Sequence, residues 1–167
     1  YYKQAYPHTR EIGIAVDITN EDGIETILEV IKENFGTLHI LINNVGTNIR
    51  KPAIDYKETE ITQILQTNLL AAYNLSIKCF ELLKENKNNA SVVFISSVAG
   101  LTHIKTGAIY GMSKAAMNQL TKNLAVEWAK EGIRVNAVAP WYIKTPLAQT
   151  VLKNEAYLDE VLQRTPL

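Results

Sequence analysis

The sequence predicts an α/β protein in which helices cover both faces of a doubly wound parallel sheet. Short apolar segments typical of buried strands alternate along the chain with longer segments whose apolar residues recur at helical spacing. The segment 38–43 (L-H-I-L-I-N) is too apolar for a half-exposed strand and suits one covered on both faces. This alternation indicates a parallel sheet with right-handed crossovers.

The expected elements follow one another along the chain. A strand at residues 12–18 precedes a helix that begins near Asn20, where acidic residues follow a capping side chain, and ends before Gly36. A long helix is expected at residues 58–85, and another runs from Tyr110 to about residue 130. The other segments are strands at residues 38–43, 92–96 and 133–139, and a loop with an amphipathic segment at residues 142–167.

Composition limits the partners and the location. The 167 residues fit one domain, residues 1–167, and 47% apolar residues are enough for one core. Lys plus Arg and Asp plus Glu both number 17, so we expect no nucleic acid or membrane partner but a small neutral ligand. The single cysteine, Cys79, offers neither a disulfide nor a metal site and is expected to fill space in a helix. The absence of about 18 consecutive apolar residues and of a hydrophobic signal core favours a cytoplasmic protein.

Three residues carry the predicted chemistry. Tyr110 and Lys114 are four apart in a helical segment, so their side chains share one face. A phenol has a pKa of about 10, and an ammonium within roughly 4–6 Å lowers it, which makes Tyr110 a usable acid or base. Ser97 follows the buried strand at 92–96, at the end where parallel sheets bind ligands, and its hydroxyl is suited to holding a carbonyl oxygen near Tyr110.

Alone, a Y-x-x-x-K pair is better explained as a chance pair on a solvated helix face. Together with I-S-S-V-A-G, N-N-V-G and R-V-N-A-V-A-P, the run Y-G-M-S-K-A-A resembles the short-chain dehydrogenase/reductase family. The runs N-N-V-G-T-N-I-R-K-P, E-W-A-K-E-G-I-R-V-N and A-P-W-Y-I-K-T-P-L are most similar to plant tropinone reductase-like enzymes. The resemblance implies a Rossmann-like fold and assigns the catalytic roles to Ser97, Tyr110 and Lys114.

Asn68 interrupts the apolar face of the predicted long helix. A buried amide needs hydrogen-bond partners, and one explanation is a bond that locks the helix to its neighbour. The resemblance implies a second role, because the matching asparagine helps bind a water that links the active-site lysine to solvent. Asn68 is therefore expected to be a fourth catalytic residue.

The resemblance also implies a cofactor site. Asp17 would bond the adenine amino group, although an aspartate there also suits a turn. Asn43 and Gly46, in the run N-N-V-G, would lie beside the adenosine ribose, and Asn43 is equally suited to tying neighbouring strands. Tyr110 and Lys114 would contact the nicotinamide ribose. The nicotinamide carboxamide would be framed by three residues near the last strand: Pro140, Ile143 and Thr145, with Trp141 where the family has glycine.

Parts of the family pattern have no counterpart in these residues. The eight glycines never cluster into a glycine-rich phosphate turn, and no run matches the family's first two strands or its last strand. The segment 12–18 would then be the family's third strand and would lack its neighbours in the sheet. We expect an incomplete sequence, a truncated product or the ordered part of a longer enzyme.

The predicted function is the NADP(H)-dependent reduction of a ketone, tropinone-like or another small carbonyl compound, to a secondary alcohol, with NAD(H) as the open alternative. The resemblance implies a homodimer or homotetramer that pairs through the long helix and the Tyr110 helix. Epimerases and dehydratases of the extended branch share Y-x-x-x-K but carry a longer substrate domain. The other alternative is a catalytically inactive chain that binds intact relatives. His103 is expected to be an ordinary surface histidine.

Overall fold

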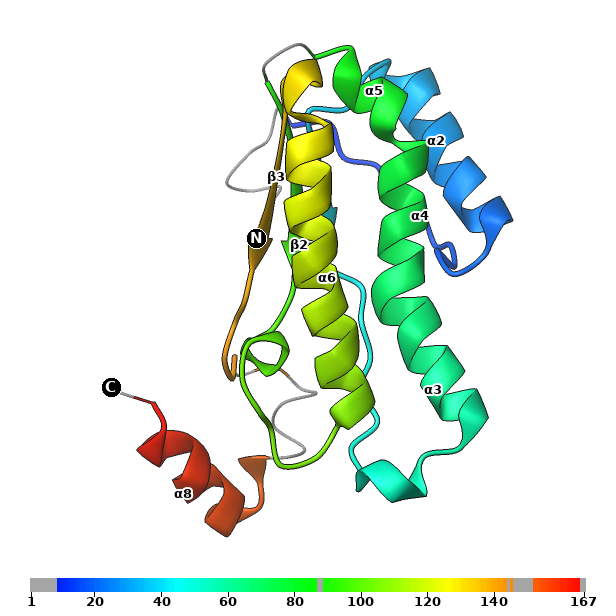
Figure 1. Ribbon diagram of the computed structural model, residues 1–167. Helices are drawn as coiled ribbons and strands as arrows, with labels where there is room; N and C mark the ends of the chain where they lie inside the picture. The colour runs from blue at the N-terminus through cyan, green and yellow to red at the C-terminus, as the bar shows by residue number, and fades with distance from the viewer. Residues whose placement is uncertain (1–8, 87–88, 144, 146–151, 166–167) are drawn as a thin grey trace.

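The computed structural model (Figure 1) describes residues 9–86, 89–143, 145 and 152–165. Within them, a parallel sheet contains β1 (Ile40–Asn43), β2 (Ala90–Ile95) and β3 (Ile133–Val138), in the order β1-β2-β3. Leu41 pairs with Val92, and Val92 pairs with Val135. The predicted α/β class with a parallel, Rossmann-like sheet is confirmed, and so are three of the four predicted strands.

Helix α2 (Glu21–Phe35) begins and ends where the sequence indicates. The Asn20 side chain caps its first turn by accepting a hydrogen bond of 2.8 Å from the Gly23 backbone. Gly36 ends it with a φ of 75°, a conformation that glycine adopts without strain.

The predicted long helix at residues 58–85 is a continuous helical arm with two irregularities. It consists of α3 (Glu58–Leu65), the π-helical turn η2 (Gln66–Leu70), α4 (Ala71–Lys78) and α5 (Phe80–Lys84). Asn68 lies in the π-helical turn, and Cys79 separates α4 from α5. The Cys79 thiol is fully buried, and this burial raises its pKa to about 11, as expected for a space-filling cysteine.

Helix α6 (Ala108–Glu127) carries Tyr110 and Lys114 in its first two turns. It continues into the 3₁₀ turn η4 (Ala129–Glu131) and ends at Gly132, whose φ is 74°. The predicted segment at 142–167 contains α8 (Glu155–Gln163), while residues 144, 146–151, 166 and 167 lie outside the described part. Two further 3₁₀ turns lie in the loops after β1 and β2: η1 (Ala53–Asp55) and η3 (Val98–Gly100).

One apolar core joins the helices to one face of the sheet. Leu41, Val92 and Val135, which are paired across the strands, belong to the same buried cluster as residues of α2, α4 and α6. Figure 1 shows these helices on the same side of the strands. The free energy gained by burying this apolar surface holds the layer together.

The other face of the sheet is open in the described residues. Ile40 and Ile42 are 58% and 59% exposed, and they alternate with buried Leu41 and Asn43. The expectation that helices cover both faces of this strand is therefore wrong for the described residues. The apolar run at 38–43 did not distinguish a covered face from an apolar face left open.

The predicted strand at residues 12–18 does not form. Residues 9–17 have no regular secondary structure, and Ile12 and Ile14 are 39% and 43% exposed. A strand is stabilised by hydrogen bonds to a neighbouring strand, and no strand among the described residues pairs with this segment. Near this segment, the Arg10 guanidinium instead lies 5.4 Å from the Phe35 ring at the end of α2.

No helix among the described residues is long and apolar enough to cross a membrane.

Candidate active site

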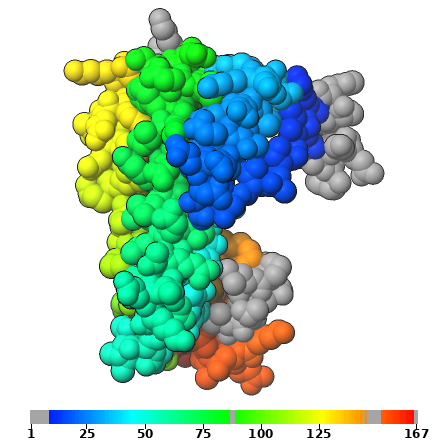
Figure 2. Space-filling model, turned by 90° about the vertical axis from the view of Figure 1, so that its right-hand side faces the viewer, coloured from blue at the N-terminus to red at the C-terminus, as the bar shows by residue number. Residues whose placement is uncertain are grey.

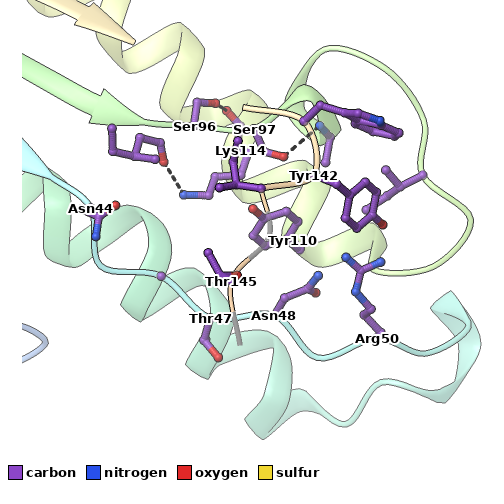
Figure 3. Close-up of a pocket in the computed structure, with 16 residues that line it drawn as sticks. Asn44, Thr47, Asn48, Arg50, Ser96, Ser97, Tyr110, Lys114, Tyr142 and Thr145 are labelled. Carbon is purple, nitrogen blue, oxygen red and sulfur yellow. Dashed lines mark hydrogen bonds between the residues drawn. The ribbon is translucent and has the colours of Figure 1, made fainter. Parts of the chain in front are cut away.

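A pocket of about 430 Å³ lies where the three strands end. Because parallel strands end at the same edge of a sheet, the loops that follow them meet there. Its wall combines four stretches of the chain. They are Asn44, Gly46, Thr47, Asn48 and Arg50 after β1; Ile95, Ser96, Ser97, Ala99 and Ile104 at the end of β2 and in the loop that follows; Tyr110 and Lys114 from α6; and Trp141, Tyr142, Ile143 and Thr145 after β3. Figure 3 shows these side chains around one space.

Tyr110 and Lys114 face the pocket together, as their spacing predicts. The Lys114 Nζ lies 5.8 Å from the centroid of the Tyr110 ring and donates a hydrogen bond of 2.7 Å to the Ile95 carbonyl at the end of β2. Lys114 is only 3% exposed, and this burial lowers its pKa to about 8. The side chain is therefore mostly an ammonium at pH 7.

Ser97 lines the same pocket and lies at the start of η3. Its Oγ accepts a hydrogen bond of 3.1 Å from the Ala99 backbone, which fixes the side chain. Among the described residues no acceptor takes its hydroxyl hydrogen, so this hydrogen is available to a ligand in the pocket. The neighbouring Ser96 donates to the Lys114 carbonyl at 3.3 Å and thereby ties α6 to the end of β2.

Asn68 is fully buried behind the pocket wall. Its Oδ1 accepts from the Thr47 backbone at 2.7 Å, and its Nδ2 donates to the Thr47 carbonyl at 2.9 Å and to Ser113 Oγ at 3.2 Å. These bonds tie η2 to the loop after β1 and to α6, as the structural explanation of this residue expects. Its catalytic role stays a prediction.

Gly46 separates Asn68 from Lys114. A Cβ at Gly46 would lie 3.4 Å from Asn68 Oδ1 and 3.6 Å from Lys114 Nζ. The absence of a side chain there keeps the wall beside the ammonium open.

Ile143 and Thr145 also line the pocket, and they lie in the loop after β3.

Three other predicted cofactor residues lie outside the pocket wall. Asn43 faces the helices, is 5% exposed and donates to Ser76 Oγ at 2.9 Å, so it ties β1 to α4. Asp17 is exposed, and its carboxylate accepts hydrogen bonds from the Thr19 backbone and hydroxyl, which lower its pKa. The Pro140 carbonyl accepts a backbone bond from Val98 at 3.0 Å.

Several pocket residues were missed from the sequence. Asn48 and Arg50 belong to the loop after β1, and Tyr142 belongs to the loop after β3. Loop residues have no periodicity, and the only available signal was their position shortly after a strand end. His103 was predicted to be a surface histidine; it is exposed and does not line this pocket.

Helix α8 is attached to the rim of the pocket through aromatic residues. The hydroxyls of Tyr142 and Tyr157 are 2.5 Å apart, and burial raises the pKa of Tyr142. The Trp141 Nε1 donates to Thr165 Oγ1 at 3.2 Å, and its ring meets the Tyr142 ring edge-on, with 4.9 Å between the centroids. Trp141 and Tyr142 therefore give the pocket an aromatic wall next to α8.

Comparison with known proteins identifies relatives of this chain. A sequence profile described as "short chain dehydrogenase" matches residues 3–156. A tropinone reductase homolog of Arabidopsis thaliana is 49% identical over 156 residues, 93% of this chain and 59% of the relative. Another, named as chloroplastic, is 46% identical over 159 residues, 95% of this chain and 49% of the relative. The chain thus spans about half to three-fifths of the length of these two relatives.

Solved structures show the same fold. A putative gluconate dehydrogenase from Agrobacterium tumefaciens superposes with a TM-score of 0.90 at 28% identity, over 98% of this chain and 65% of that one. A structure of ElxO with NADP bound superposes with a TM-score of 0.77 at 32% identity, over 84% of this chain and 57% of that one.

Proposed function

Because the chain belongs to the short-chain dehydrogenase family, we propose that it carries the active site of an NADP(H)-dependent oxidoreductase that reduces a small ketone, tropinone-like or otherwise, to a secondary alcohol. The observation that supports this most directly is the convergence of Tyr110, Lys114 and Ser97 on one pocket at the ends of the strands. The preference for NADP(H) over NAD(H) rests on the similarity to tropinone reductase homologs and to the NADP-bound structure of ElxO.

A nicotinamide riboside would lie at the reactive end of the pocket. The wall at Gly46 is open beside Lys114, and Lys114 uses one of its three N–H hydrogens on Ile95, which leaves two for ribose hydroxyls. Ile143 and Thr145 would hold the carboxamide, and Tyr110 would bond the ribose. The more distant contacts, from Asp17, Asn43 and Pro140, rest on the family pattern alone. When bound, the cofactor supplies the hydride.

The side chains of this chain then handle the oxygen of the substrate. Negative charge develops on the carbonyl oxygen during reduction, and Ser97 and Tyr110 meet it with two hydroxyl donors. One such donor is typically worth about 10²- to 10³-fold in rate. Tyr110 gives its proton to this oxygen, and the Lys114 ammonium stabilises the negative charge left on the phenol.

Asn68 would take part in resupplying this proton. The side-chain amide of Asn68 is already bonded to Thr47 and Ser113. A water that links Lys114 to solvent would therefore bind the backbone of the π-helical turn that contains Asn68, and not its side chain. Single π-helical turns are frequent at functional sites, which favours this role.

The test is product analysis with the protein expressed from its complete reading frame. We expect oxidation of NADPH that depends on an added ketone and yields the secondary alcohol. When the hydride position of the NADPH nicotinamide carries deuterium, this deuterium should appear on the carbinol carbon of the product. If no ketone of a broad panel supports NADPH oxidation, or if the product is a dehydrated or epimerised compound, the proposal is wrong.

A second candidate is a catalytically inactive chain that associates with intact relatives. The open apolar face around Ile40 and Ile42 favours it, because such a face invites a partner. A mixed oligomer that forms with an intact relative and does not bind cofactor through this chain would support this alternative.

A further inference from the structure

Arg50 brings a positive charge to the pocket from the loop after β1. In Figure 3 its guanidinium points toward the space bordered by Asn48, Tyr110 and Tyr142. The guanidinium carbon lies 5.7 Å from the centroid of the Tyr142 ring, and Nη1 lies 3.4 Å from the Tyr157 hydroxyl. A planar cation that rests on an aromatic ring keeps its orientation and leaves its remaining N–H groups free to bind.

In the described part of the chain this guanidinium has no acidic partner. No described carboxylate lies within 4.0 Å of it, whereas the adjacent Lys51 is paired with Glu60 at 2.7 Å. The described residues that line the pocket include no aspartate or glutamate, and Lys114 is a second cation among them. In a chain with equal numbers of acidic and basic residues, the pocket is therefore locally positive.

Asn48 marks the same end of the pocket as a place for a polar group. Its Oδ1 is buried without a hydrogen-bond partner among the described residues, and it lies 3.3 Å from the position of a Cβ built on Gly107. A buried amide oxygen without a donor costs free energy until a ligand supplies one. A hydroxyl or amine hydrogen of a ligand supplies such a donor, whereas a carboxylate has none, so an anionic group belongs at Arg50 and not at the Asn48 oxygen.

We propose that Arg50 binds the carboxylate of the substrate, so that the enzyme acts on oxo acids, in which one molecule carries a ketone and a carboxylate. The Arg50 guanidinium would pair with the two carboxylate oxygens, while Ser97 and Tyr110 bind the ketone oxygen. This deepens the proposed function and rests on it. It also replaces the neutral ligand that the overall charge balance suggests, because the field at the pocket differs from the average over the chain.

A structural role is the competing explanation, because Arg50 also connects the loop after β1 to Tyr142 and Tyr157. Loss of such a clamp would affect all substrates alike. Recognition of a carboxylate predicts an effect only on substrates that carry one. The ratio of kcat/KM for two substrates of the same shape separates the two explanations.

The experiment compares levulinate with its neutral amide, levulinamide, using the protein expressed from its complete reading frame. We expect the wild-type protein to prefer levulinate and Arg50→Gln to reduce this preference by about 10- to 100-fold, the usual value of a hydrogen bond to a charged group. Most of the change should lie in KM. Arg50→Lys should recover part of the preference, and Arg134→Gln, which removes an exposed charge on β3 outside the pocket, should leave the ratio unchanged.

An equal loss for both substrates in Arg50→Gln would assign the residue to the clamp and overturn the proposal. A wild-type preference for levulinamide would overturn it as well. If no ketone is turned over, the proposed function fails, and calorimetric titration with the same two compounds still tests the anion site. Tighter binding of levulinate that disappears in Arg50→Gln would then support the site, and equal binding would refute it.

Discussion

The Tyr110 hydroxyl is the single group on which the proposed reaction depends most. Tyr110→Phe keeps the ring that packs beside Lys114 and removes only the hydroxyl. We expect ketone reduction to fall about 10²- to 10⁴-fold, the usual loss for a general acid, with little change in cofactor affinity or thermal midpoint. Steady-state kinetics and thermal unfolding measure both. A variant that retains more than about a tenth of wild-type turnover would exclude Tyr110 as the proton donor.

Lys114 predicts a pH dependence of its own. Burial lowers its pKa to about 8, so the ammonium is present below that pH and is lost as the pH rises through it. We expect kcat/KM for ketone reduction to decline as the pH rises through about 8, because this parameter reports groups of the free enzyme. Lys114→Met should be slow throughout, bind cofactor more weakly and lack this limb of the pH profile. If kcat/KM of Lys114→Met still declines as the pH rises through about 8, the decline belongs to another titrating group.

At the scale of elements, Asn68 holds the helical arm to the active-site loop. Asn68→Ala leaves the half-buried Thr47 backbone groups without their partners, so we expect the free energy of unfolding to fall by about 1–3 kcal/mol. Denaturant unfolding measures this, with Asn74→Ala on the exposed side of α4 as the matched control. Equal stability of the two variants would show that the amide does not tie these elements together.

The outer faces of the helical arm and of α6 carry apolar residues that the fold leaves exposed. Leu70, Tyr73 and Ile77 on the arm are 40–44% exposed, and Val126 on α6 is 78% exposed. Figure 2 shows the arm, teal to green, running along the molecule, with α2 against its upper part only. We therefore expect a homodimer or homotetramer that pairs through these helices.

Light scattering on the protein expressed from its complete reading frame tests this pairing. We expect a dimer or tetramer and a shift toward monomer in Tyr73→Glu, because a charge in the interface would lose its water. Arg134→Glu, at an exposed position of β3, is the control for the added negative charge. A wild-type protein that is monomeric at all concentrations would remove the proposal.

For the molecule as a whole, the question is how much cofactor binding these 167 residues support. In the proposed function the pocket would hold the nicotinamide end, but these residues contain no glycine-rich turn for the pyrophosphate, which supplies much of dinucleotide binding. We expect the 167-residue segment expressed alone not to bind NADPH at micromolar concentrations. Calorimetry that shows tight, saturable binding to the segment would contradict this expectation.

Local patterns were sufficient for most elements and for the centre of the site. Helical spacing predicted α2, the arm and α6, and the distance of four residues placed Lys114 beside Tyr110 because one helical turn brings them to the same face. Ser97 was predicted from its position after an apolar strand, since parallel strands end at one edge. In each case the physical cause lies within a few residues of its effect.

Features that depend on distant partners were decided only by the tertiary structure. The segment 12–18 has the composition of a strand, but hydrogen bonds to a neighbour make a strand, and none is formed there. Arg50 meets Tyr157 across 107 residues of chain, and Asn48 and Tyr142 reach the same pocket from different loops. No periodicity links such residues, because their proximity results from the packing of the sheet, α6 and α8 rather than from local backbone geometry.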